Sequence, residues 1–351
     1  WIKIMAYSSI VKPTDYFNTL LYTGNDGNGR SITGVGFQPD WTWIKGRSNS
    51  DNHILGDSAR GGNKQIYSNL TNAETSATGM IQSFNTDGFT LGNDGAVNGS
   101  SETYASWNWK AGGSSTTNPS GGTITTTASV NTTAGFSVFT YTGTGVAAHL
   151  AHGLGVAPTV VIIKGRSNTD QWFVKHPGIA SNEYLYLNTT SAKVSGANAW
   201  SATNPDATKI YVGTDAGVNG SGVTYVCYAF AEKKGYSKFG SYTGNGNADG
   251  TFVYTGFKPA FVMVKCTSNA DNWNIHDSVR NEFNLTDNIL YPNLSNAEGN
   301  PSVLSMDLLS QGFKFRGSDG GTNGSGSPYI YMAFAENPFV GNVSGTAVPV
   351  T

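Results

Sequence analysis

The sequence has little charge and no long apolar run. Aspartate, glutamate, lysine and arginine make up 13% of the 351 residues, and the formal net charge is -2. Lysine and arginine are scattered, so the chain lacks the basic stripe that neutralises nucleic acid phosphates. No stretch reaches the roughly 18 apolar residues of a membrane helix. We therefore expect neither nucleic acid binding nor insertion into a membrane.

Cysteine is also scarce. The only two, Cys227 and Cys266, are too few for a disulfide framework. Their counterparts in the repeats described below are Ser106 and Gly46, which indicates that both are incidental small buried residues. The N-terminus has no apolar core of a signal peptide, and Met5 is a natural start codon. Residues 1–4 are then explained either by an upstream start or by a processed precursor.

Aromatic residues and turn formers are abundant instead. The chain contains 12% aromatic residues and 45 glycines, which suits short strands joined by tight turns. No long apolar pattern has the helical period of 3.6 residues. The segment Lys64–Gly79 is the one place where we expect a short helix.

One pattern occurs three times in the same order. Each copy reads Gly-x-x-Pro, an apolar run, then Lys-x-x-Ser-Asn-x-Asp, at residues 36–51, 155–170 and 256–271. Each opens on Tyr-Thr-Gly, at Tyr22, Tyr141 and Tyr242, and closes on an Asp-x-x-x-Asn-Gly-Ser loop and an apolar strand. Leu70–Glu74 also returns as Leu294–Glu298. So many ordered matches identify an internal repeat.

The repeat predicts the domain organisation and the fold class. We expect an N-terminal arm (1–16), repeat 1 (17–113), a Gly/Ser/Thr-rich linker (114–134), repeat 2 (135–234), repeat 3 (235–340) and a C-terminal tail (341–351). Several short strands in about 100 residues favour an all-β fold. We predict three tandem antiparallel β-sandwich modules, jelly-roll or lectin-like.

The closing strand of each repeat is informative because side chains alternate between its faces. One face carries Ala105, Trp107 and Trp109, and it is bulky in every copy, so it should belong to the core. The other face, with Tyr104 and Ser106, has smaller and more mixed side chains, and we expect a loop or a neighbouring module to pack against it.

The best recurrent polar cluster follows the Gly-x-x-Pro strand, and indoles stand next to it in two copies. Turn chemistry explains the residue choice, because Ser, Asn and Asp satisfy local backbone groups. The alternative is a glycan or Ca²⁺ site built from oxygens and an indole. We expect no cofactor, with Ca²⁺ as the alternative. The candidate binding residues are Lys45, Asn49, Asp51, Lys164, Asn168, Asp170, Trp172, Lys265, Asn269, Asp271 and Trp273. The Asp-x-x-x-Asn-Gly-Ser loop permits the same two interpretations.

Catalytic residues do not recur. No histidine position is shared by the repeats, so we interpret the histidines as surface or loop residues, and leave open a metal site formed by His149, His152 and His176. Asp57-Ser58 and Asp277-Ser278 return without a counterpart in repeat 2, and no triad can be composed from them. We expect no catalytic residues and no enzymatic activity, with a polysaccharide-degrading enzyme as the least favoured alternative.

Repeat 1 and its N-terminal flank contain five distinctive segments, at residues 12–24, 36–45, 57–60, 87–92 and 107–113. These segments resemble a repeat domain of virion proteins from tailed phages, common in marine phages and usually described as fibre or structural protein. The resemblance is specific over repeat 1 and looser over repeats 2 and 3, and the variant His152-Gly-Leu-Gly-x-x-Pro158 resembles tail-associated proteins. It implies a particle-borne protein with a lectin-like sandwich and carries no catalytic residues.

Two functions follow as expectations. The first is a structural component on the surface of a bacteriophage virion, such as a fibre, tail appendage or head-decoration protein. It would contact other virion proteins and assemble as a homo-oligomer, with a trimer as the natural form. The second is an adhesin that binds host-surface glycans. Exposed aromatic side chains beside Asn or Asp in several repeats would favour the second.

Overall fold

The computed structural model describes residue 8 and residues 10–113 and 117–338. The chain is all-β, with 41% of residues in strands and 6% in helices. In the part that the structure describes, no helix has the length and hydropathy needed to cross a membrane. The expected N-terminal arm lies partly, and the C-terminal tail wholly, outside the described residues.

The three repeats share most of their strands. Repeat 1 follows η1 (Pro13–Asp15) and contains β1 (Phe17–Thr23), β2 (Arg30–Thr33), β3 (Trp41–Gly46), β4 (Ile54–Asp57), β5 (Lys64–Tyr67), β6 (Thr75–Ser76), β7 (Ile81–Asn85), β8 (Gly88–Leu91), α1 (Gly95–Asn98) and β9 (Thr103–Trp109). Repeat 2 contains β11 (Phe136–Thr142), β12 (Ala148–Ala151), β13 (Val160–Gly165), β14 (Trp172–Lys175), β15 (Glu183–Tyr186), β16 (Val194–Ser195), α2 (Ala197–Trp200), β17 (Lys209–Val212), α3 (Ala216–Asn219) and β18 (Thr224–Phe230). Repeat 3 contains β19 (Ser237–Thr243), β20 (Phe252–Tyr254), β21 (Phe257–Cys266), β22 (Asn274–Asp277), η2 (Ser302–Leu304), β23 (Met306–Leu309), β24 (Gly312–Phe315) and β25 (Pro328–Pro338).

Each repeat has one large and one small antiparallel sheet. The large sheets share the orders β1-β9-β3-β4, β11-β18-β13-β14 and β19-β25-β21-β22, and the small sheets are β2-β8-β7, β12-β17 and β20-β24-β23. The strand expected at Gly-x-x-Pro is confirmed as β3, β13 and β21. The opening tyrosine of each repeat pairs with the tyrosine of its closing strand, and their rings stack with centroids 5.1, 4.9 and 4.9 Å apart.

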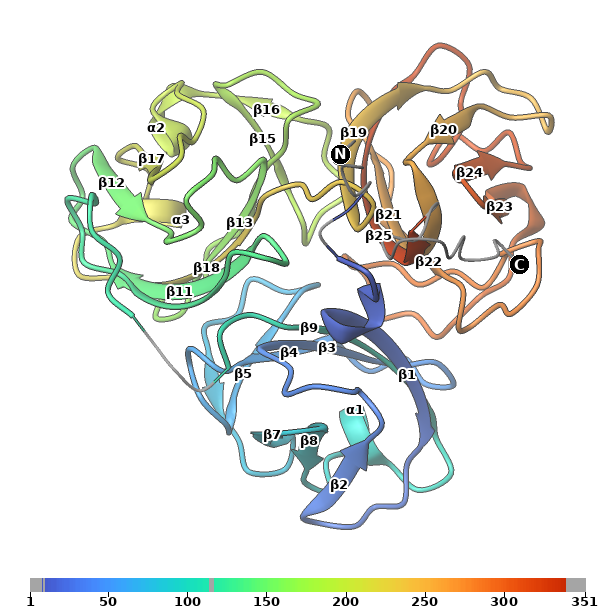
Figure 1. The fold of residues 1–351 in the computed structure, drawn as a ribbon, viewed down its shortest axis with the longest axis horizontal. Coiled ribbons are helices and arrows are strands. Elements are labelled where there is room, and N and C mark those ends of the chain that lie inside the picture. Colours follow the sequence, from blue (N-terminus) through green and yellow to red (C-terminus); the bar gives the residue numbers. More distant parts are fainter. Residues whose placement is uncertain (1–7, 9, 114–116, 339–351) are drawn as a thin grey trace, which may run out of the picture.

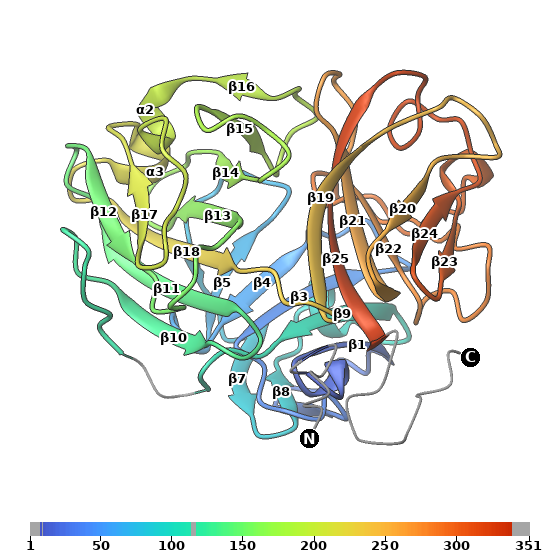
Figure 2. The same ribbon diagram turned by 45° about the horizontal axis from the view of Figure 1, so that its top comes forward.

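The large sheets surround a common centre, and the small sheets lie at the periphery (Figures 1 and 2). The bulky face of every closing strand belongs to one core cluster that draws on all three repeats. Trp41 of repeat 1 stacks at 4.4 Å on Tyr228 of repeat 2, and Trp109 meets Phe334 of repeat 3 at 5.7 Å. The prediction that this face is core is confirmed, but the core is shared between repeats.

The smaller face of each closing strand packs inside its own repeat. Tyr104 shares a cluster with Ile32 of β2 and Phe89 of β8, whereas Tyr331 meets Phe313 of β24 at 5.3 Å. The expectation that a loop or a neighbouring module covers this face is wrong. The physical reason is volume, since only the bulky face can fill the space where three sheets converge.

Two segments differ from their expected secondary structure. The short helix expected over Lys64–Gly79 is wrong, because β5 and β6 form there; β5 pairs with β4, and Ile66 enters the shared core. In the segment expected to be a linker, β10 (Thr127–Asn131) pairs with β11 and extends the large sheet of repeat 2. Tertiary pairing outweighs local propensity in both places.

Candidate functional site

The lysine of the recurrent polar cluster is buried in every repeat. Its ammonium group donates to the carbonyl of the following residue, at 2.6 Å for Lys45, 2.7 Å for Lys164 and 2.6 Å for Lys265. It also reaches the carbonyl of the cluster's asparagine, at 3.0, 3.5 and 3.3 Å respectively. The lysine therefore closes the turn from inside and offers no free ammonium group to a ligand.

Burial lowers the pKa of each of these lysines to about 8, from an ordinary value near ~10.4. At a pH between the folded and the unfolded pKa, the lysine is protonated in the unfolded chain and mostly deprotonated in the folded chain. The free energy of unfolding should therefore rise with pH in this range. We expect wild type to gain on the order of 1 kcal/mol relative to Lys164→Met between pH 7.5 and 9.5, measured by denaturant unfolding. The exposed Lys12→Met variant should follow wild type. Parallel curves for wild type and Lys164→Met would contradict this assignment.

The other candidate residues of the cluster serve the turn or lie towards the surface. Asn49 accepts from the backbone N–H of Asp51 at 3.3 Å, as expected of a turn, and Asp51 itself is exposed. Asn168 and Asp170 are half-buried, Asn269 is exposed, and Asp271 is half-buried. Trp172 and Trp273 are buried at 0% and 2% exposure, so their indole faces are not available to a sugar.

The asparagine of the Asp-x-x-x-Asn-Gly-Ser loop also has a structural role. Asn219 is buried, and its amide donates to the carbonyls of Val146 and Gly213 at 2.6 and 2.7 Å. Asn98 and Asn323 make equivalent bonds in the other repeats. The loop's aspartate accepts from a backbone N–H at the start of the next turn in all three repeats. Both recurrent polar motifs therefore satisfy backbone groups inside the fold.

The indoles hold the repeats together. Trp172 donates to the carbonyl of Tyr67 in repeat 1, and Trp273 donates to the carbonyl of Tyr186 in repeat 2, both at 2.9 Å. At the equivalent position of repeat 1, Nε2 of His53 lies 3.0 Å from the carbonyl of Tyr291 in repeat 3. The same contact thus closes junctions 1/2, 2/3 and 3/1, each named by the two repeats that meet there.

Buried histidines correct the expectation of surface or loop residues. His53, His152, His176 and His276 are at most 3% exposed, and only His149 is half-exposed. Burial lowers the pKa of His176 to about 4 and that of His276 to about 3, so both rings are neutral at pH 7. His176 contacts the carbonyl of Tyr331 in repeat 3 at 3.0 Å and so has a place in junction 2/3.

Two junctions carry a bidentate ion pair. Arg166 binds Glu74 through two bonds of 2.9 Å, and Arg47 binds Glu298 at 2.7 and 3.0 Å. In junction 2/3, Lys193 and Thr267 stand in place of the glutamate and the arginine, and the bond from Lys193 N–H to the carbonyl of Thr267 at 2.9 Å remains without the ion pair. The ammonium group of Lys265 also donates across this junction to the carbonyl of Thr190 at 3.2 Å. Sequence reasoning missed these pairs, although the return of Leu70–Glu74 as Leu294–Glu298 was their signal.

The aspartate of each recurring Asp-Ser pair forms a buried ion pair with the arginine three residues later. Asp57 binds Arg60 at 2.5 Å, and Asp277 binds Arg280 at 2.6 Å, with all four side chains fully buried. Asp57 also accepts from Tyr228 of repeat 2 at 2.7 Å. Within residues 8, 10–113 and 117–338, no group of three or more His, Cys, Asp or Glu is placed to hold a metal ion. Cys227 and Cys266 are free and buried.

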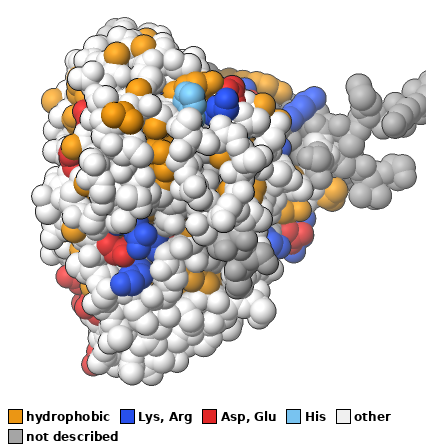
Figure 3. Space-filling model, turned by 90° about the vertical axis from the view of Figure 1, so that its left-hand side faces the viewer, with side chains coloured by type: hydrophobic (Ala, Val, Ile, Leu, Met, Phe, Trp, Pro, Cys, Tyr) orange, Lys and Arg blue, Asp and Glu red, His pale blue; other side chains and the backbone are white. Residues whose placement is uncertain are grey.

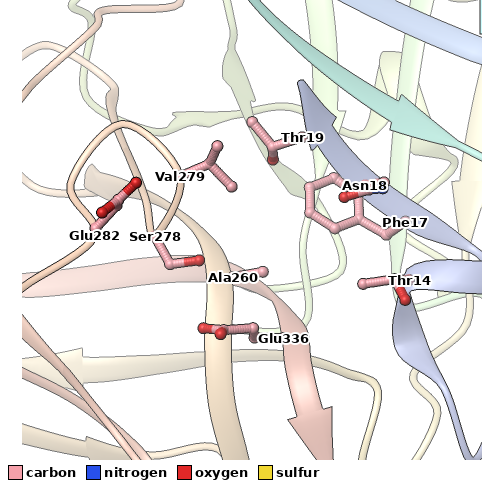
Figure 4. Close-up of a pocket in the computed structure, with 9 residues that line it drawn as sticks. All are labelled: Thr14, Phe17, Asn18, Thr19, Ala260, Ser278, Val279, Glu282 and Glu336. Carbon is pink, nitrogen blue, oxygen red and sulfur yellow. The ribbon is translucent and has the colours of Figure 1, made fainter. Parts of the chain in front are cut away.

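A pocket of about 300 Å³ lies at junction 3/1, away from the recurrent polar cluster and the Asp-x-x-x-Asn-Gly-Ser loop. Thr19 and Phe17 of β1 face Ser278, Val279 and Glu282 of repeat 3, as Figure 4 shows. Thr14, Asn18, Ala260 and Glu336 complete the lining. The sequence signal was weak, because it consists of positions that differ between repeats rather than positions that recur.

Charged groups are sparse on the surface shown in Figure 3, where most side chains are uncharged and the few charged ones gather in small groups. This face therefore offers no continuous basic field of the kind that nucleic acid phosphates require.

Comparison with known proteins gives one match. A family model described as a domain of unknown function, DUF7483, matches residues 12–338 and so spans all three repeats. No curated protein and no solved structure matches the chain. Because the match covers nearly all of the sequence and treats the three repeats as one unit, the chain belongs to the DUF7483 family.

Proposed function

We propose that this chain is a non-enzymatic structural component of a bacteriophage virion, located on the particle surface as a fibre, tail appendage or head-decoration protein. The observation that carries the proposal is the cyclic closure of the three repeats. An indole or imidazole contact is repeated at all three junctions, and the recurrent polar residues are used inside the fold. The recurring residues are therefore explained by the folding of each repeat and by the contacts between repeats, rather than by catalysis.

We also propose that each large sheet forms a β-sandwich module with its small sheet. Three separate apolar clusters, one in each repeat, support this arrangement, and the cluster of repeat 1 joins β2 and β8 to β3, β4 and β9. The ring presents three related outer surfaces around one axis, which suits contacts with other virion proteins at a three-fold position. Assembly of several copies, with a trimer as the expected form, remains a prediction.

The location can be tested on purified particles of the phage that encodes the sequence. We expect mass spectrometry of gradient-purified particles to detect the chain, and antibodies against it to label intact particles in electron microscopy. An abundant host protein from the same lysate should be lost during purification and serves as the control. If the chain stays in the soluble fraction and is absent from the particle band, the structural role is wrong.

The second candidate function, binding of host-surface glycans, is favoured by one observation, which is the pocket at junction 3/1. The recurrent turns do not support glycan binding in the same way, because the indoles beside them, Trp172 and Trp273, are buried. A glycan-binding role would therefore depend on a single site in the chain rather than on three equivalent sites.

A further inference from the structure

We propose that the pocket at junction 3/1 binds one sugar unit, neutral or amine-bearing, whose hydroxyl or ammonium groups donate to oxygens of both repeats. The inference does not depend on a location in a virus particle. It gives the glycan-binding candidate a specific site, and its failure would leave the structural role untouched.

The first supporting observation is an unpartnered buried hydroxyl. Thr19 is 4% exposed, it lines the pocket, and its Oγ1 has no hydrogen-bond partner among the described residues. A buried hydroxyl without a partner is unfavourable, and most such groups in proteins are satisfied. Figure 4 shows this side chain opposite Ser278, across the space that a ligand would fill. A ligand hydroxyl placed there would supply the missing bond.

The second observation is that small side chains create the pocket at this junction. The strand registers place Thr19 level with Val138 of β11 and Phe239 of β19, which both enter the shared core. On the other wall, Ala260 takes the place of Asp40, whose carboxylate in repeat 1 accepts from the hydroxyl of Ser58 at 2.6 Å. Thr19 is smaller than Phe239 and similar in size to Val138, and Ala260 is smaller than Asp40, so this junction has less side-chain volume than either of the other two on one of its walls.

The third observation is the chemistry of the lining, which contains two carboxylates and no lysine or arginine. Glu336 has a counter-ion, since its Oε2 lies 3.1 Å from Nζ of Lys258. Glu282 is exposed and has no ion-pair partner within the described part of the chain. The lining therefore accepts hydrogen bonds and repels anions, which favours a neutral or amine-bearing ligand over an acidic one.

The apolar part of the lining fits the same ligand. Val279 is half-buried and offers hydrocarbon surface beside the hydroxyls of Thr19 and Ser278, whereas Phe17 and Ala260 line the pocket at 1% and 9% exposure. Small-molecule sites combine apolar walls with a few placed polar groups, and a sugar ring presents C–H groups on its faces and hydroxyls at its edge. A volume of about 300 Å³ limits the occupant to a small ligand.

Ligand-observed NMR with the whole chain can test the proposal, using a panel of glucose, galactose, mannose and glucosamine, with glucuronate as the anionic comparison. We expect at least one neutral or amino sugar to bind with a stoichiometry of one per chain, and glucuronate to bind more weakly. Thr19→Val, which removes the hydroxyl and keeps the shape, should weaken binding roughly ten-fold. Thr19→Phe introduces the residue that repeat 3 has at the equivalent position, Phe239, and its ring should fill the pocket and abolish sugar binding.

Matched measurements separate binding from folding. Thr140→Val makes the same chemical change on β11, away from the pocket, and should leave sugar binding unchanged. Thr19→Val should retain or raise the melting temperature, because the hydroxyl that it removes has no partner. The proposal is overturned if no sugar in the panel binds, if glucuronate binds as well as the others, if Thr19→Phe still binds, or if three sugars bind per chain.

Discussion

Replacing Trp41 by alanine is expected to lower the free energy of unfolding by about 3–5 kcal/mol, because a large aromatic side chain leaves a cavity in a packed core. Trp41 is 1% exposed and stacks at 4.4 Å on both Trp109 and Tyr228. Since Tyr228 belongs to repeat 2, the cavity should weaken two repeats at once. Chemical denaturation followed by tryptophan fluorescence measures the loss.

The same experiment tests whether the repeats fold as one unit. We expect a single unfolding transition in wild type and in Trp41→Ala, since one core cluster joins all three repeats. Val146→Ala, at a side chain that is 63% exposed, should stay within about 0.5 kcal/mol of wild type. Separate transitions, of which only one shifts in Trp41→Ala, would show that the repeats unfold independently.

Replacing Asp277 by alanine is expected to cost about 3–5 kcal/mol, because the change leaves the buried guanidinium of Arg280 without its nearest carboxylate. Asp277 also accepts from Nε1 of Trp107 at 3.0 Å, so the variant additionally leaves an indole of repeat 1 without its partner. The exposed pair of Lys12 and Asp15 gives a control, and Asp15→Ala should cost less than about 1 kcal/mol. Thermal and denaturant unfolding both measure the difference.

Repeat 2 provides a second variant for the same junction, because His176 and Ile179 stand where repeat 3 has Asp277 and Arg280. Asp277→His combined with Arg280→Ile removes both charges and leaves no unpaired ion. The double variant should recover a large part of the stability that Asp277→Ala loses. A double variant as unstable as the single one would mean that the ion pair contributes through its geometry rather than through charge compensation.

Much of the secondary structure could be predicted from the sequence. Gly-x-x-Pro followed by an apolar run identified β3, β13 and β21, since proline and glycine mark strand boundaries and β-branched and aromatic residues favour strands. The helix expected at Lys64–Gly79 was wrong because β5 is held by its pairing with β4, a contact that local propensity does not register. The repeated turn was interpreted correctly as turn chemistry, but the burial of Lys45 inside it was not foreseen.

The candidate site was less predictable because it depends on differences between repeats. Recurrence identifies what every repeat needs for folding, and these residues proved to be caps, turn lysines and junction contacts. The pocket at junction 3/1 depends on Thr19 and Ala260, two unremarkable residues in the sequence, and on Glu282 from a segment with no counterpart motif. These side chains line one pocket only because the fold brings repeats 1 and 3 together.

The three-fold repeat, the all-β class, the strand positions and the bulky face of each closing strand were determined by the sequence alone. A period of two residues decides which side chains share a face, but it carries no information on what that face meets. The tertiary structure decided that the bulky faces of three sheets fill one core and that equivalent contacts close a ring. The reason is physical, since the burial of three wide aromatic faces is achieved only when residues more than a hundred positions apart in the chain are brought together in space.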